Sequence, residues 1–127
     1  MNPVAKNILV IGGLLMALGV VLGAVGTHGL RARLTPDQLS VFETAVRYHI
    51  YNALGLLIIG AVALSANPPQ LRWAAGLIVV GIVLFSGALY AASLGAPRFV
   101  HVFTPLGGVA LIAGWVVFAV SIWRIRD

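Results

Sequence analysis

Four long apolar runs constrain the fold of this chain more than any other feature of its sequence. They lie at about residues 8–27, 44–65, 71–93 and 105–123. Each is close to the ~20 residues that a helix needs to cross ~30 Å of hydrocarbon. Backbone in contact with lipid must form its hydrogen bonds within one segment, so each run is predicted to be a transmembrane helix.

The composition agrees with an integral membrane protein. Hydrophobic residues make up 61% of the 127 residues and charged residues 9%, whereas soluble domains carry about 25% charged residues. No polar stretch is long enough for a second, water-soluble domain, so residues 1–127 are predicted to form one transmembrane domain. The first run exceeds the ~7–15 apolar residues of a secretory signal, and we expect it to be retained as a helix.

The connections between the runs predict how the helices are arranged. Residues 66–70 and 94–99 are short linkers, and short linkers join antiparallel neighbours. The connection at 28–43 is longer and polar. An all-α, antiparallel up-down bundle of four transmembrane helices is therefore the expected fold.

Two Thr-Pro pairs predict helix starts. Thr35 can cap a helix and Pro36 suits its first position, so the second helix is expected to begin near Pro36, before the membrane. The same logic, applied to Thr104 and Pro105, predicts that the fourth helix begins at Pro105.

Alternating helices would gather most of the polar side chains at one end of the bundle. The residues expected to form a polar cluster or ligand site at this end are His28, Glu43, Arg47, Tyr48, His49, Tyr51, Asn52, Tyr90, His101 and Thr104. The opposite end carries both termini, with tryptophans and basic residues of the kind that anchor helices at an interface.

The start of the second run is the densest part of this polar end. Asn52 would lie ~10 Å inside the hydrocarbon, where an amide without a partner costs several kcal/mol. Either a ligand site or hydrogen bonds between helices would explain it. Glu43 and Arg47 are four residues apart and can pair. The stripe expected to face lipid is Val46, Ile50, Ala53 and Leu57.

Several functional classes are disfavoured. The chain has no cysteine, which excludes disulfides, thiolate nucleophiles and thiolate-bound metal. Its three histidines include no closely spaced pair, so no metal site or cofactor is predicted. No nucleophile with an acid or base partner is evident, and we do not expect an enzyme. The net charge is +5, but the basic residues are scattered, so a nucleic-acid partner is not expected.

Glycines recur in the first and fourth runs. Gly19 and Gly23 have the spacing that lets two helices approach closely in lipid. Packing within the chain is the favoured explanation, although a contact between copies or with a larger complex fits the same pattern.

Four motifs in order resemble one known family. They are G23-A-V-G-T-H-G-L30, F42-E-T-A-V-R-Y-H-I-Y-N-A-L54, L84-F-S-G-A-L-Y90 and T104-P-L-G-G-V-A-L-I-A-G-W115. The chain resembles the small bacterial inner-membrane proteins called domain of unknown function 423, whose eukaryotic relatives are called transmembrane protein 256. The resemblance implies the fold and a multi-pass location in the inner membrane, but no biochemical activity. Thr27 stands where the family usually has Ala, and Asn52 where it commonly has His.

Orientation and function complete the expectations. Basic residues are nearly balanced between the two ends, and we favour cytoplasmic termini. The favoured function is binding of a small polar ligand, a lipid headgroup or a partner protein at the polar end. The alternatives are an accessory subunit of a membrane complex and a self-associating transporter or proton-conducting unit.

Overall fold

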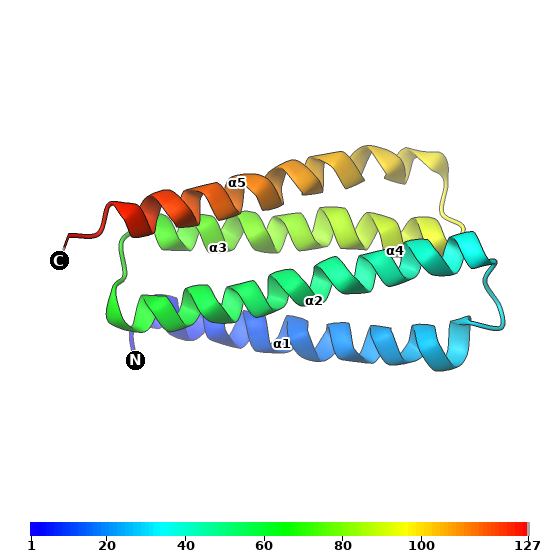
Figure 1. Ribbon diagram of the computed structural model, residues 1–127, viewed down its shortest axis with the longest axis horizontal. Helices are drawn as coiled ribbons and strands as arrows, with labels where there is room; N and C mark the ends of the chain where they lie inside the picture. The colour runs from blue at the N-terminus through cyan, green and yellow to red at the C-terminus, as the bar shows by residue number, and fades with distance from the viewer. Residues whose placement is uncertain (127) are drawn as a thin grey trace.

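The structure is a computed structural model that describes residues 1–126, and it is an up-down bundle of helices. Four helical segments are long and apolar enough to cross a membrane: Pro3–Leu30, Pro36–Ser65, Gln70–Ser93 and Arg98–Trp123. They run in alternating directions, and both chain ends lie at the same end of the bundle (Figure 1). The predicted all-α bundle of four transmembrane helices is confirmed.

The first helix begins earlier than the apolar run. α1 spans Pro3–Val25 and continues into a π-helical turn, η1, at Gly26–Leu30. Asn2 caps it, because its Oδ1 accepts a hydrogen bond from the N–H of Ala5 at 2.7 Å. Asn2 Nδ2 also donates to the carbonyl of Ala63 at 2.8 Å. One side chain thus satisfies backbone groups at the ends of two helices.

The second helix begins where its Thr-Pro pair predicts. α2 spans Pro36–Ser65. Thr35 Oγ1 accepts from the N–H of Gln38 at 3.2 Å, and Gln38 Oε1 accepts from the N–H of Thr35 at 3.0 Å. This reciprocal capping box explains why the helix extends beyond the apolar run.

The third crossing is one continuous helix with a π-helical turn inside it. It consists of α3 (Gln70–Gly81), the π-helical turn η2 (Ile82–Ser86) and α4 (Gly87–Ser93). Gly95 then reverses the chain with a φ of 95°, a conformation that glycine adopts without strain.

The second Thr-Pro prediction is wrong. α5 spans Phe103–Trp123 and follows directly on a 3₁₀ turn, η3, at Arg98–Val102. Thr104 is therefore already inside the helix and caps nothing. Its Oγ1 is buried and, among the described residues, has no hydrogen-bond partner. The 3₁₀ turn leads directly into α5, as such turns often do at the start of an α-helix, so no side-chain cap stands at Thr104.

The helices pack mainly as two pairs, α1 with α2 and α3 with α5, and α2 also packs on η2 and α4. Glycines allow both close approaches. A Cβ at Gly19 would lie 2.9 Å from Cγ1 of Ile50, and a Cβ at Gly107 would overlap the backbone of Phe85. These two glycines therefore serve packing within the chain.

The face of α2 expected to meet lipid instead meets α1. Ala53 is fully buried, and Val46 and Ile50 lie beside glycines of α1. The large apolar or aromatic side chains that α2 exposes most are Tyr51, Leu54 and Ile58, at 60%, 50% and 50%. The expectation was wrong because it assumed that polar residues avoid the lipid side. In the structure α2 exposes Tyr51, and its small and β-branched residues pack against α1.

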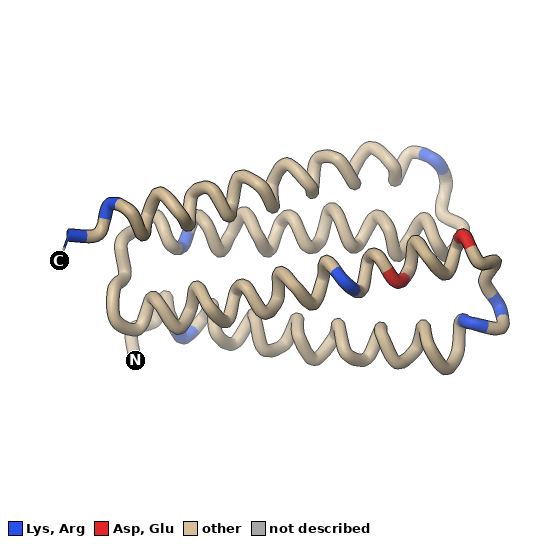
Figure 2. The backbone as a smooth tube through the Cα atoms, viewed as in Figure 1, with Lys and Arg blue, Asp and Glu red and all other residues tan. Residues whose placement is uncertain are grey.

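Charged residues lie mainly towards the two ends of the bundle, with one acidic and one basic residue further along α2 (Figure 2). At the end with the termini, Trp73 and Trp123 are 66% and 86% exposed. Exposed tryptophans at this level are typical of a membrane interface.

Candidate functional site

His49 is the most buried of the predicted site residues. It is 2% exposed. Its Nδ1 lies 2.8 Å from the hydroxyl of Tyr90, and its Nε2 lies 2.7 Å from the carbonyl oxygen of Leu15. A carbonyl only accepts, so Nε2 carries a hydrogen, and in the neutral ring Nδ1 accepts from Tyr90. Both ring nitrogens are thus occupied, and His49 joins α1, α2 and α4.

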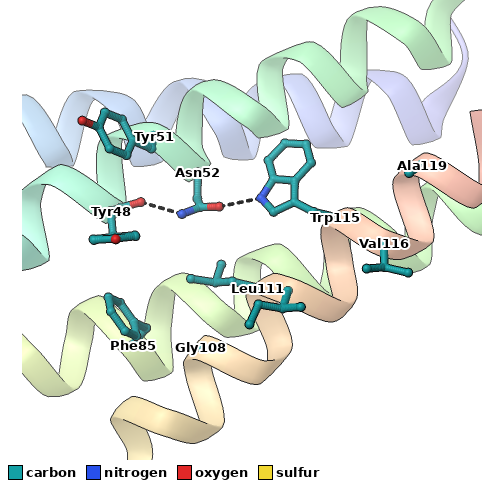
Figure 3. A pocket seen from close by; sticks show the side chains of 10 residues that line it. Tyr48, Tyr51, Asn52, Phe85, Gly108, Leu111, Trp115, Val116 and Ala119 are labelled. Atoms are coloured by element: carbon teal, nitrogen blue, oxygen red, sulfur yellow. Dashed lines mark hydrogen bonds between the residues drawn. The ribbon is translucent and has the colours of Figure 1, made fainter.

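Asn52 joins the two halves of the bundle. It is 6% exposed. Its Nδ2 donates to the carbonyl of Tyr48 at 2.8 Å, and its Oδ1 accepts from Nε1 of Trp115 at 2.9 Å (Figure 3). Trp115 lies on α5, and Gly55 leaves room for its ring against α2. The partner that the depth of Asn52 demands is therefore Trp115.

A lateral groove opens beside this hydrogen bond, between α2 and α5. We call it the α2–α5 groove, and its volume is about 700 Å³. α2 contributes Tyr48, Tyr51 and Asn52, and η2 contributes Phe85. α5 contributes Gly108, Leu111, Ile112, Trp115, Val116 and Ala119 (Figure 3). The lining is almost entirely apolar, with its polar groups towards one end.

Aromatic rings form the polar end of the α2–α5 groove. The Tyr48 ring meets that of Phe85 edge-on, with centroids 5.1 Å apart, and that of Tyr51 with centroids 6.1 Å apart. Phe85 belongs to the π-helical turn η2, where the extra residue redirects the side chains, and such turns are frequent at functional sites. Next to it, Ser86 Oγ donates to the carbonyl of Ala45 at 2.8 Å and ties η2 to α2.

The other predicted site residues lie apart from this groove. Glu43 and Arg47 are exposed on α2 and border a separate pocket of about 260 Å³ between α2 and α1. His28 is exposed on η1, and His101 is exposed on η3. Within residues 1–126, no group of three or more His, Asp or Glu side chains could hold a metal ion.

Five of the ten predicted residues thus form two neighbouring centres, and the other five lie apart from both. The first is His49 with Tyr90, closed within the bundle. The second is Asn52 with the two tyrosines of the α2–α5 groove. Sequence reasoning missed Trp115 and Phe85, which it assigned no role in the site. A signal existed for Trp115, because its indole N–H in mid-membrane needs an acceptor just as Asn52 needs a donor.

The fold defines a small four-helix membrane protein with a lateral, largely apolar groove. Residues 22–108 match the family described as protein of unknown function (DUF423). The chain belongs to this family, which confirms the resemblance drawn from its motifs.

Relatives of the same kind cover nearly the whole chain. The UPF0382 membrane protein of Staphylococcus haemolyticus is 38% identical over 119 residues, which cover 94% of this chain and 97% of the relative. The UPF0382 membrane protein YwdK of Bacillus subtilis is 39% identical over 117 residues, covering 91% and 95%. No solved structure matches this chain.

Proposed function

We propose that the protein binds an amphipathic membrane lipid in the α2–α5 groove, with a hydrocarbon chain along α5 and the polar end beside Tyr48 and Tyr51. The observation that carries this proposal is the groove itself. At about 700 Å³ with an almost wholly apolar lining, it has the size and composition of a ligand pocket.

The polarity of the groove favours one orientation of the lipid. The tyrosine hydroxyls can donate or accept hydrogen bonds at one end, and Tyr48 and Tyr51 are 42% and 60% exposed. Arg47 precedes Tyr51 by four residues, so it lies on the same face of α2, one turn nearer the end of the bundle. A lipid headgroup beside these three side chains would leave its chain to follow Leu111 and Val116 towards the bilayer centre.

Cross-linking in membranes tests the proposal. The probe is a fatty acid with a photoactivatable diazirine near the end of its chain. We expect it to label residues 108–119 of α5 in a saturable way, so that excess unlabelled fatty acid removes most of the product. Gly108→Leu should lower labelling at least severalfold, because a Cβ there makes only ordinary contacts, the nearest at 3.7 Å, and the added side chain fills the groove.

The matched control is Gly13→Leu. Gly13 is exposed on α1 with no atom within 4 Å of its Cβ position and lines no described pocket. Labelling that resists competition, or that falls equally in both variants, would overturn lipid binding in this groove. Cross-links between two copies of the chain at residues 108–119 would show instead that a second copy fills it.

We also infer binding rather than catalysis, a location in the bacterial inner membrane, and cytoplasmic termini. The Tyr90 hydroxyl and the His49 ring resemble a nucleophile and base, but His49 is 2% exposed and its second nitrogen is bonded to a carbonyl. The relatives support a bacterial membrane, since they are named membrane proteins and come from bacteria. The orientation rests on the basic residues beside the termini.

A further inference from the structure

A second, smaller groove runs between α1 and α3, starting at the end of the bundle that carries the termini. Its volume is about 380 Å³. Its walls are apolar and include Ile8 and Ile11 of α1 and Val79 and Val80 of α3, with Gly76 between the helices. Asn7 and Arg72 lie at its polar end.

Arg72 also borders a separate polar cleft. This cleft has a volume of about 180 Å³ and is lined by Val4, Asn67, Pro69 and Arg72. An apolar groove and a polar cleft therefore meet at one cationic side chain. We call the two together the Arg72 cleft.

Within residues 1–126, the charged side chains at the Arg72 end of the bundle are all basic. Lys6, Arg72, Arg124 and Arg126 belong to this end of the bundle, whereas the acidic residues of the described chain lie towards the other end (Figure 2). The side-chain hydrogen bonds of residues 1–126 include none from Arg72. Its guanidinium donors can thus serve a phosphate, which suits their fork geometry.

The polar cleft and the apolar groove lie at the depths in the membrane where the headgroup and the acyl chains of a lipid lie. Trp73 is 66% exposed beside Arg72, and an exposed Trp at the end of a transmembrane helix marks headgroup level. Val79 and Val80 lie seven and eight residues further along α3, or ~11 Å deeper. The polar part is therefore at the interface and the apolar part points into one leaflet.

We propose that the Arg72 cleft binds one phospholipid with an anionic headgroup, its phosphate on Arg72 and one acyl chain between α1 and α3. Positive charge at the headgroup level, next to a narrow apolar groove, complements such a lipid. This site is independent of the α2–α5 groove, because it lies between different helices and begins at the opposite end of the bundle.

Native mass spectrometry of the full chain with equal amounts of phosphatidylglycerol and phosphatidylcholine of identical acyl chains tests the site. We expect a preference for phosphatidylglycerol. Arg72→Gln should lower this preference about fivefold, the contribution of one cation beside an anionic lipid. Arg124→Gln removes the same charge at the same end, but Arg124 lines neither part of the cleft, so the preference should stay.

A second pair of variants tests the acyl groove. Gly76→Leu should lower retention of phosphatidylglycerol, because no atom lies within 4 Å of its Cβ position and the side chain enters the groove. Gly13→Leu should not change it. Equal effects of Arg72→Gln and Arg124→Gln, or of Gly76→Leu and Gly13→Leu, would refute the site. Gly108→Leu should leave the preference intact, so this site and the α2–α5 groove can fail separately.

Discussion

At the scale of single residues, two buried polar side chains hold helices together. His49 uses both ring nitrogens to reach α1 and α4. Asn52 uses its Oδ1 to reach α5 through Trp115. In hydrocarbon neither group could turn to water instead, so each hydrogen bond stabilises one packing arrangement over others that leave it unmade. Polar residues here select the arrangement of apolar helices.

Removing the indole donor should destabilise the bundle. Trp115→Phe leaves Asn52 Oδ1 without its partner in an apolar setting, and we expect a loss of about 1–2 kcal/mol. The measurement is unfolding by sodium dodecyl sulfate in mild detergent, followed by circular dichroism. Asn52→Leu alone should cost a similar amount. The double variant should cost clearly less than the sum, and simple additivity would contradict a direct interaction.

The sequence predicted that Asn52 needs a hydrogen-bond partner, but it did not predict which residue that partner is. The depth of Asn52 in its run required a partner, but Trp115 is 63 residues away in the chain and no periodicity links them. His49, Tyr48 and Tyr51 are close in sequence, but only the packing of the helices determines that His49 is buried and that the two tyrosines line the groove. Contacts between distant residues depend on how helices rotate against each other, which local pattern does not fix.

At the scale of helices, glycines set how closely the elements approach. Gly107 and Gly108 are adjacent, but they meet different surroundings. A Cβ at Gly107 would overlap the backbone of Phe85, whereas one at Gly108 would make only ordinary contacts with the Phe85 ring at 3.7 Å and beyond. The backbone cannot yield as a flexible side chain can, so Gly107 holds α5 against η2.

The two adjacent positions give a matched test. Gly107→Ala should force α5 away from η2 and cost about 1–3 kcal/mol, as other overpacked substitutions do. Gly108→Ala should change stability by less than about 0.5 kcal/mol. The same detergent unfolding measures both. Equal stability of the two variants would mean that α5 does not pack on η2 as closely as described.

Helix limits show where local signals suffice. Thr35 and Gln38 form a capping box within one turn, so the start of α2 was predictable. Asn2 and the 3₁₀ turn before Phe103 lie outside the apolar runs, so α1 and α5 begin before the runs that predicted them. The π-helical turn of η2 was not predicted either, since its sequence is uniformly apolar.

At the scale of the whole molecule, the end of the bundle that carries more Lys and Arg residues is expected to face the cytoplasm. The chain has no cysteine, so single substitutions give labelling sites without background. Ala32→Cys and Gln70→Cys are exposed positions at opposite ends. With cytoplasmic termini, a membrane-impermeant maleimide on intact cells should label only Ala32→Cys. Both should react after permeabilisation, and the reverse pattern on intact cells would place the termini outside.

The sequence by itself determined the number of crossings, their order and the membrane environment. These depend on the length and hydropathy of each run, which are local properties. Only the tertiary structure decided that α2 turns Val46 and Ile50 to α1, that Asn52 meets Trp115, and that grooves remain beside α5 and at Arg72. The rotation of each helix about its axis is set by the fit of side chains from segments distant in sequence. In a chain so uniformly apolar, the hydrophobic pattern does not indicate which face of a helix packs against its neighbours.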